Sequence, residues 1–160
     1  MAWNAPATAT VGQLVTASFW NAQIRDNFLA LNVAPAQSAT VAAAQTTTST
    51  SYTDLTTAGP SVTLETGATV WVALAAEINH NNVRHYMSVA VSGATTTAAS
   101  DNHCLLVVNA DTFADNKHAV SFPLTVTPGS NTFTTKYKSG TGTVTFGYRS
   151  LTVGRATAVS

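Results

Sequence analysis

Charged residues are scarce in this chain of 160 residues. Lysine and arginine together number 7, aspartate and glutamate together number 7, and the formal net charge is zero. A protein that binds nucleic acid or an anionic membrane through electrostatics carries a basic patch or stripe. The sequence has no such stripe, so we expect neither a nucleic acid nor a membrane as partner.

Cysteine and long hydrophobic runs are also nearly absent. Cys104 is the only cysteine, which excludes an intrachain disulfide. Its place in the apolar run Cys104–Val108 predicts a packed thiol, and the lack of disulfides favours synthesis in a reducing cytoplasm. The longest apolar run, Val70–Ala76, is far shorter than the ~18 residues of a membrane-spanning helix. Residues 1–6 also lack the features of a secretory signal.

The sequence contains none of the short motifs that carry common catalytic chemistry. There is no G-x-S-x-G elbow, no H-E-x-x-H helix and no glycine-rich phosphate loop. The few carboxylates are scattered, so an acid/base pair would have to be assembled entirely by the fold. We therefore expect a protein that is not an enzyme and that has no cofactor.

From Tyr52 onward the apolar residues recur with a period of two, which is typical of β-strands. The apolar positions are Val62, Leu64, Val70, Val72, Leu74, Ala76, Ile78, Met87, Val89, Val91, Val120, Phe122, Leu124, Val126, Phe133, Tyr137, Val144, Phe146 and Tyr148. About eight short strands predict an antiparallel β-sandwich of the jelly-roll type over residues 52–160. The period slips between Tyr148 and Leu151, which indicates a bulge near Arg149–Ser150 that turns Leu151 and Val153 inward.

The strands that end at Ile78 and begin near Met87 are expected to form a hairpin. Two registers are possible, one with Asn81–Asn82 as a two-residue turn, the other with His80 opposite His85. The second register would bring two metal-binding side chains together, but we favour solvated histidines because no acidic or cysteine ligand is adjacent. Asp111 and Asp115 share a polar loop without the spacing of a calcium loop, so no bound metal is expected.

The stretch Val11–Leu31 differs from the rest because it predicts a helix over about residues 17–31. Thr16 and Ser18 are residue types that cap helix N-termini. One stripe of the helix is apolar and the opposite side is partly apolar, so we expect the helix to be held between two bodies, such as sister subunits and a host assembly. The alternative is a helix buried in a single core. The stripe consists of Ala17, Trp20, Ile24, Phe28 and Leu31. Residues 1–31 are thus interpreted as an anchor and the Ala/Thr/Ser-rich residues 32–51 as an extended linker.

This N-terminal segment resembles that of a group of tailed-bacteriophage virion proteins. The residues that carry the resemblance are Trp3, Pro6, Gly12, Val15, Thr16, Ala17, Asn21, Arg25, Asp26, Asn27, Ala30 and Leu31. Trp20 stands where those proteins commonly have an aliphatic residue. The resemblance implies a minor tail, fibre or capsid-decoration protein that is located on the virion and has other virion proteins as partners. The residues expected to dock are Trp3, Thr16, Trp20, Ile24, Arg25, Asp26, Asn27, Phe28 and Leu31.

A second resemblance concerns the β-domain. The order of Thr127–Phe133, Lys136–Tyr137 and Arg149–Val153 is similar to the end of the tumour-necrosis-factor-like jelly rolls of phage fibre heads. It implies a homotrimer. Trp71, Ala73 and Ala75 alternate with Val70, Val72 and Leu74, and a strand that is apolar on both faces is usually covered on both. These three residues are the predicted trimer contact.

An alternative function is a receptor-binding or glycan-binding module that acts in host adsorption. Its contacts would come from the loops Asn79–Arg84 and Asn109–Asn116. Tyr52, Trp71 and Tyr86 are aromatic residues that could stack on sugar rings, although aromatic residues on strands more often fill cores or subunit contacts.

Overall fold

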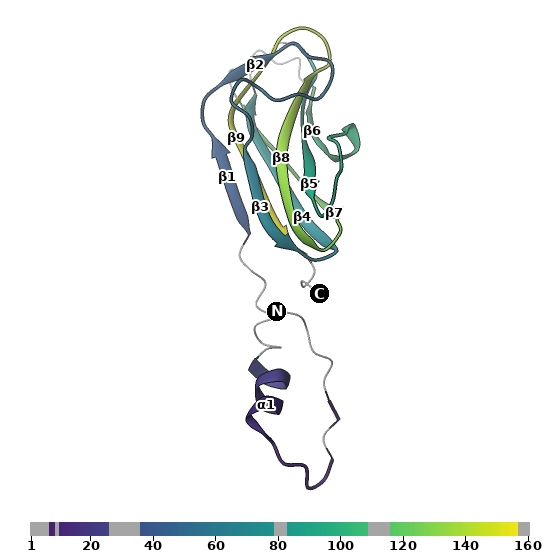
Figure 1. Ribbon diagram of the computed structural model, residues 1–160. Coiled ribbons are helices and arrows are strands. Elements are labelled where there is room, and N and C mark those ends of the chain that lie inside the picture. Colours follow the sequence, from purple (N-terminus) through teal and green to yellow (C-terminus); the bar gives the residue numbers. More distant parts are fainter. Residues whose placement is uncertain (1–6, 9, 26–35, 79–82, 109–115, 157–160) are drawn as a thin grey trace.

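The computed structural model describes residues 7–8, 10–25, 36–78, 83–108 and 116–156 of the chain (Figure 1). Its strands are β1 (Gln37–Val41), β2 (Gln45–Thr47), β3 (Ser61–Thr66), β4 (Thr69–Ile78), β5 (His85–Gly93), β6 (Cys104–Val107), β7 (Asn116–Thr125), β8 (Gly129–Ser139) and β9 (Val144–Arg155). Its helical turns are α1 (Ala17–Trp20), the π-helical η1 (Asn21–Arg25) and the 3₁₀ turn η2 (Asp101–His103).

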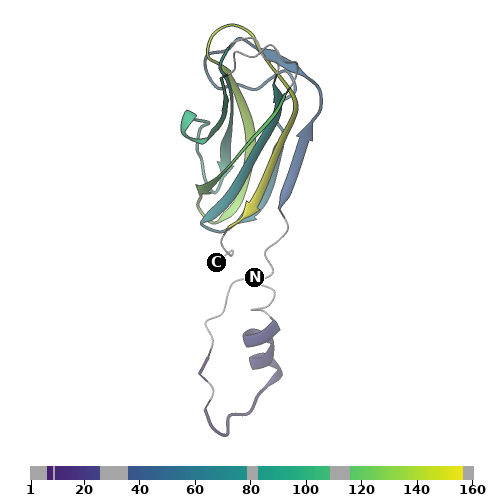
Figure 2. The ribbon, with the colours of Figure 1, turned by 180° about the vertical axis from the view of Figure 1, so that it is seen from behind.

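The strands form two antiparallel sheets that pack face to face, which confirms the predicted β-sandwich (Figures 1 and 2). One sheet has the order β1-β9-β4-β7, with β2 also paired to β9, and the other has the order β3-β8-β5-β6. From β2 to β9 the chain crosses to the other sheet at every connection except that between β5 and β6. This is the strand order of a jelly roll.

The core lies between the two sheets and follows the period-two pattern of the sequence. The even-numbered residues of β4 are buried from Val70 to Ile78, and the odd-numbered residues of β5 face them from the other sheet. Tyr137 and Phe146 are fully buried and pack with their ring centroids 5.0 Å apart. The largest stabilising contribution therefore comes from apolar side chains that both sheets remove from water.

The prediction that β4 and β5 form a hairpin is wrong. β4 pairs with β7 and β9, whereas β5 pairs with β6 and β8 in the other sheet. The two strands do share a common interior, but they face each other across the sandwich. The alternation of buried and exposed side chains on the two strands fits this arrangement as well as it fits a hairpin, because in either case each strand presents one apolar face to the core. Residue His80, which one register placed opposite His85, lies outside the described residues.

Part of the segment expected to be a linker is strand. β1 and β2 both lie between residues 32 and 51, and both pair antiparallel with β9. Within β1 only Ala39 and Val41 are half-buried, and the remaining three residues are exposed. An edge strand of this kind gains most of its stability from backbone hydrogen bonds to β9, so its side chains carry little apolar signal.

A β-bulge interrupts β9, as the sequence predicts, at Tyr148 and Arg149. The pairing of β4 with β9 shifts between Ala75 and Glu77, and Tyr148 has a positive φ of 40°. The bulge turns Tyr148 outward, where it is 55% exposed, although the sequence pattern had placed it in the core. Arg149 takes the inward position and is completely buried.

Arg149 ties the segment around β2 to the sandwich. Its guanidinium donates to the backbone oxygens of Thr57 and Ala43 and to the Gln45 side chain, each at 3.3 Å. Its Cζ atom lies 5.3 Å from the centre of the Tyr137 ring. A buried cation is stable only when such polar and aromatic partners replace water. Arg149 therefore fixes the position of residues 43–57 against the sandwich.

The start of the 94–103 loop is held by a tight contact with β8. At Gly93 (φ 110°) an added Cβ would lie 2.4 Å from the backbone oxygen of Ser130, so only glycine fits. The buried Asn131 accepts from the backbone N–H of Thr95 at 2.7 Å and donates to Thr66 at 2.8 Å. These bonds determine the direction in which the loop leaves β5.

Candidate functional sites

The N-terminal segment forms the helical start that the sequence predicts. The hydroxyl of Thr16 accepts the backbone N–H of Phe19 at 3.1 Å, which is an N-cap. The helical backbone then runs through α1 and η1 to Arg25, and residues 26–31 of the predicted helix lie outside the described part. Figures 1 and 2 show α1 beyond the end of the sandwich at which β1 begins. The helix is therefore not part of the β-domain core.

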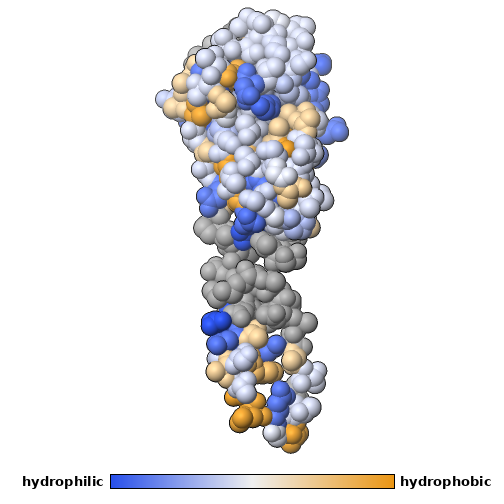
Figure 3. Space-filling view, viewed as in Figure 1, coloured by the Kyte–Doolittle hydropathy of each residue, from blue (hydrophilic) through white to orange (hydrophobic). Residues whose placement is uncertain are grey.

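Several large apolar side chains of this segment are exposed. They are Val11, Leu14, Val15, Trp20 and Ile24. Figure 3 shows hydrophobic residues gathered at the end of the segment that is remote from the sandwich. Trp20 and Ile24, both predicted docking residues, are 58% and 39% exposed. These exposed side chains make the segment a candidate docking surface.

The remaining predicted docking residues fall into two groups. Thr16 serves as the helix cap, and Arg25 lies exposed at the last described helical position. The others lie outside the described residues: Trp3, Asp26, Asn27, Phe28 and Leu31.

The predicted trimer contact lies on the outer face of the sheet that contains β4. Trp71 is 52% exposed, and Ala73 and Ala75 are half-buried beside it. The residues that pair with these three on β7 and β9 are all small and uncharged. They are Pro123, Ser121 and Ala119 on β7, and Gly154, Thr152 and Ser150 on β9. The structure thus brings the three predicted residues together on a smooth face from which a single large side chain projects.

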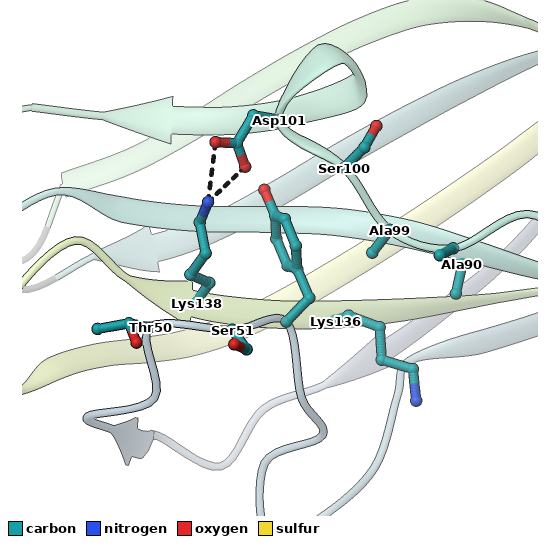
Figure 4. A pocket seen from close by; sticks show the side chains of 10 residues that line it. Thr50, Ser51, Ala90, Ala99, Ser100, Asp101, Lys136 and Lys138 are labelled. Carbon is teal, nitrogen blue, oxygen red and sulfur yellow. Dashed lines mark hydrogen bonds and ion pairs between the residues drawn. The ribbon is translucent and has the colours of Figure 1, made fainter.

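A groove crosses the outer face of the opposite sheet. Its floor is made by Ala90 of β5 and by Lys136 and Lys138 of β8. One wall is residues 50–52, which run beside β8, and the other is residues 98–101 of the loop that follows β5. The groove is open to solvent and has a volume of about 530 Å³, and Figure 4 shows Thr50 and Ser51 on one side and Ser100 on the other.

Each wall is fixed by specific hydrogen bonds. The Ser139 backbone N–H donates to Ser49 at 2.7 Å, and Thr53 and Tyr137 exchange two backbone bonds. On the other side the hydroxyl of Ser88 lies 2.7 Å from the backbone oxygen of His103 and 2.9 Å from that of Ser100, which share its single hydrogen, and it accepts the backbone N–H of Ser100 at 3.2 Å. Because both walls are bonded to the sheet, the groove is largely pre-formed, as ligand sites usually are.

Two lysine–aspartate pairs neutralise the groove. Lys138 donates to both carboxylate oxygens of Asp101, at 2.6 and 2.8 Å, and so bridges the floor and one wall (Figure 4). Lys136 donates to Asp54 at 2.7 Å. The bond from Lys138 holds the pKa of Asp101 below its usual range. Both lysine charges are therefore compensated within the site.

Lys138 contacts two aromatic rings, that of Tyr52, which lines the groove, and that of Tyr86, which lines a second pocket. The Nζ atom of Lys138 lies 4.3 Å from the ring centre of Tyr86 and 4.9 Å from that of Tyr52. Burial raises the pKa of Tyr52, and its neighbours Asp101 and Cys104 raise it further. The Tyr52 oxygen is buried and forms no hydrogen bond of ordinary geometry with a described residue. Of the three aromatic residues suggested by the sequence, Tyr52 and Tyr86 lie together here and Trp71 lies on the other sheet.

No local pattern in the sequence predicts this groove. Its walls come from two segments without apolar periodicity, and its ion pairs join residues far apart in the chain. The alternating Lys136 and Lys138 on β8 are the one local hint, since residues two apart share a face of a strand. Cys104 lies near the groove rather than in the core: it is half-buried, and its thiol donates to the backbone oxygen of Asp101 at 3.2 Å.

The candidate metal residues are not brought together in the described part of the chain. His85 is buried, donates its Nδ1–H to the backbone oxygen of Val83 at 2.8 Å and packs edge-on against Phe146. Asp111 and Asp115 lie outside the described residues. No group of three histidine, cysteine, aspartate or glutamate side chains suited to a metal occurs among the residues that are described, and no helix among them could span a membrane.

Comparison with protein-family models and with curated protein sequences finds no match to this chain.

Proposed function

We propose that this chain is a non-enzymatic structural component of a tailed-phage virion. Its N-terminal segment docks onto the particle, and its β-sandwich is displayed as part of a tail, fibre or capsid decoration. The observation that carries this proposal is the exposed apolar surface of the N-terminal segment, outside the core of the β-domain. Truncation of a large side chain at an interface hot spot costs ~2 kcal/mol or more, and tryptophan is enriched at such positions, so Trp20 is a suitable anchor.

The virion resemblance supports the same interpretation. Its residues Thr16 and Ala17 are those that cap and start the helix, so the motif coincides with a structural unit. The apolar side chains Trp20 and Ile24 project from the same unit. A capped helical turn with exposed apolar side chains is suited to insertion into a groove of another protein.

The proposed assembly is a homotrimer that uses the face around Trp71. That face is uncharged at nine paired positions across β7, β4 and β9, from Trp71 to Ala75 and their partners. Small side chains allow close approach of a second sheet, and Trp71 supplies a large apolar group to bury. Closed symmetry is the usual way in which identical chains cover such a surface.

The test of the proposed function is the location of the chain on assembled particles. Antibodies against the β-domain, with gold labels, should mark purified particles at one defined position in electron micrographs. Labels on the tail, on its fibres or on the capsid surface would each support the proposal and distinguish between these sites. Particles without any label, from cells that produce the chain, would contradict it.

A second candidate function is host adsorption by binding of a surface glycan or receptor. The observation that favours it is the pre-formed groove between residues 50–52 and 98–101. This groove lies on the sheet opposite to the proposed trimer face, so binding and assembly would not compete.

A further inference from the structure

We infer that the groove against β5 and β8 binds one neutral sugar unit of a glycan. This inference rests on the second candidate function and names its site and ligand class. The groove volume of about 530 Å³ is within the range of small-ligand pockets. The following features of the groove select an uncharged, hydroxyl-rich ligand.

The first feature is that both lysine side chains in the groove are already paired with carboxylates. Lys136 is paired with Asp54 and Lys138 with Asp101, so each lysine already has a carboxylate partner. An anionic ligand would have to separate one of these pairs, and a cationic ligand would compete with a lysine for its aspartate. A neutral ligand avoids both costs.

The second feature is the distribution of donors and acceptors. The Lys138–Asp101 pair presents an ammonium group and a carboxylate side by side at the groove, as Figure 4 shows. Adjacent hydroxyls of a sugar can donate to the carboxylate and accept from the ammonium at the same time. Hydroxyls also come from the walls, from Thr50, Ser51 and Ser100.

The third feature is the alternation of polar and apolar lining. Alanine methyl groups line the floor at Ala90 and the wall at Ala98 and Ala99. The half-buried ring of Tyr52 lines the same groove. A sugar ring has apolar C–H faces and polar edges, so it matches a lining of this kind, whereas a purely apolar ligand would leave the ion pairs desolvated.

The binding test uses the purified full chain and saturation-transfer NMR. The probes are glucose, galactose, mannose and N-acetylglucosamine as neutral sugars, with glucuronic acid and N-acetylneuraminic acid as anionic ones. We expect a signal from at least one neutral sugar and weaker or absent signals from the two acids. A signal from the acids alone, or from none of the six, would overturn the inference.

Two variants in the groove and one control variant locate the binding site. Ala90→Leu fills the floor of the groove and should abolish the signal, whereas Ala42→Leu makes the same change at an exposed position between β1 and β2 and should leave it intact. Asp101→Asn keeps the shape but removes the charge and should weaken binding by about tenfold, because hydrogen bonds to charged groups are the stronger ones. Circular dichroism checks that each variant is folded.

Binding that persists in Ala90→Leu would place the sugar elsewhere and overturn the assignment of the groove. No particle is needed for these measurements. A negative result in the sugar-binding test therefore does not bear on the proposed location on the virion. Unlabelled particles, in turn, would not bear on the proposed sugar site in the groove.

Discussion

Replacement of Trp71 by alanine should dissociate the proposed trimer without unfolding the subunit. Trp71 is 52% exposed in the single chain. A tryptophan side chain offers up to about 250 Å², so about 130 Å² remains for a partner to cover, and at about 25 cal/mol per Å² this contributes at most about 3 kcal/mol per subunit. The core beneath Trp71 consists of other residues, so the fold should persist.

The effect on assembly is large because a trimer contains three copies of the contact. A loss of about 9 kcal/mol in total lowers the association constant by about six powers of ten. The midpoint concentration of a monomer–trimer equilibrium varies with the square root of that constant, so it should rise by up to about a thousandfold. Sedimentation velocity over a dilution series measures this midpoint directly.

The matched control is Leu106→Ala. Leu106 is 47% exposed on β6, an edge strand of the other sheet, so it tests whether loss of any exposed apolar side chain has the same effect. We expect no change in the midpoint for this variant. A wild-type chain that is monomeric at micromolar concentration, or a trimer that Trp71→Ala leaves unchanged, would refute the assignment of this face.

Three further predictions concern the β-domain. Arg149→Ala should lower the free energy of unfolding by about 3 kcal/mol or more in urea titrations, because it empties a fully buried site and removes the hydrogen bonds to Thr57 and Ala43; an unchanged midpoint would contradict the role of Arg149. Cys104 should react more slowly with iodoacetamide in the folded than in the unfolded chain, measured by mass spectrometry, because burial raises its pKa and so reduces the thiolate. The lowered pKa of Asp101 means that its ion pair stabilises the fold above the ordinary carboxyl pKa and that this contribution is lost as the pH falls through the lowered value. Asp101→Asn should therefore reduce the acid-induced decrease in melting temperature, and equal decreases in both proteins would contradict this.

The sequence predicted the strands well because apolar parity is a local signal. The even positions of β4 and the odd positions of β5 are buried as expected. Parity does not distinguish strands that pair side by side from strands that face each other across the sandwich, since either arrangement buries the same residues. For that reason the sandwich was predictable and the hairpin between these two strands was not.

Other features depended on contacts that no local pattern encodes. β1 is an edge strand with mostly exposed side chains, so its composition resembled a linker. The slip in period near Leu151 revealed the bulge, but not that Arg149 would enter the core, because its partners Thr57 and Ala43 are distant in sequence. The groove likewise depends on the pairing of Lys138 with Asp101 across two elements.

The most direct test of the central claim is incorporation into particles of a chain that lacks residues 1–31. The core of the sandwich is formed by residues from Leu55 to Val153, so the truncated chain should fold and give the circular dichroism of a β-protein. We predict that it is absent from purified particles, whereas the full chain produced at the same level is present. Truncated chain found on particles in the same amount as the full chain would show that the N-terminal segment is not the anchor.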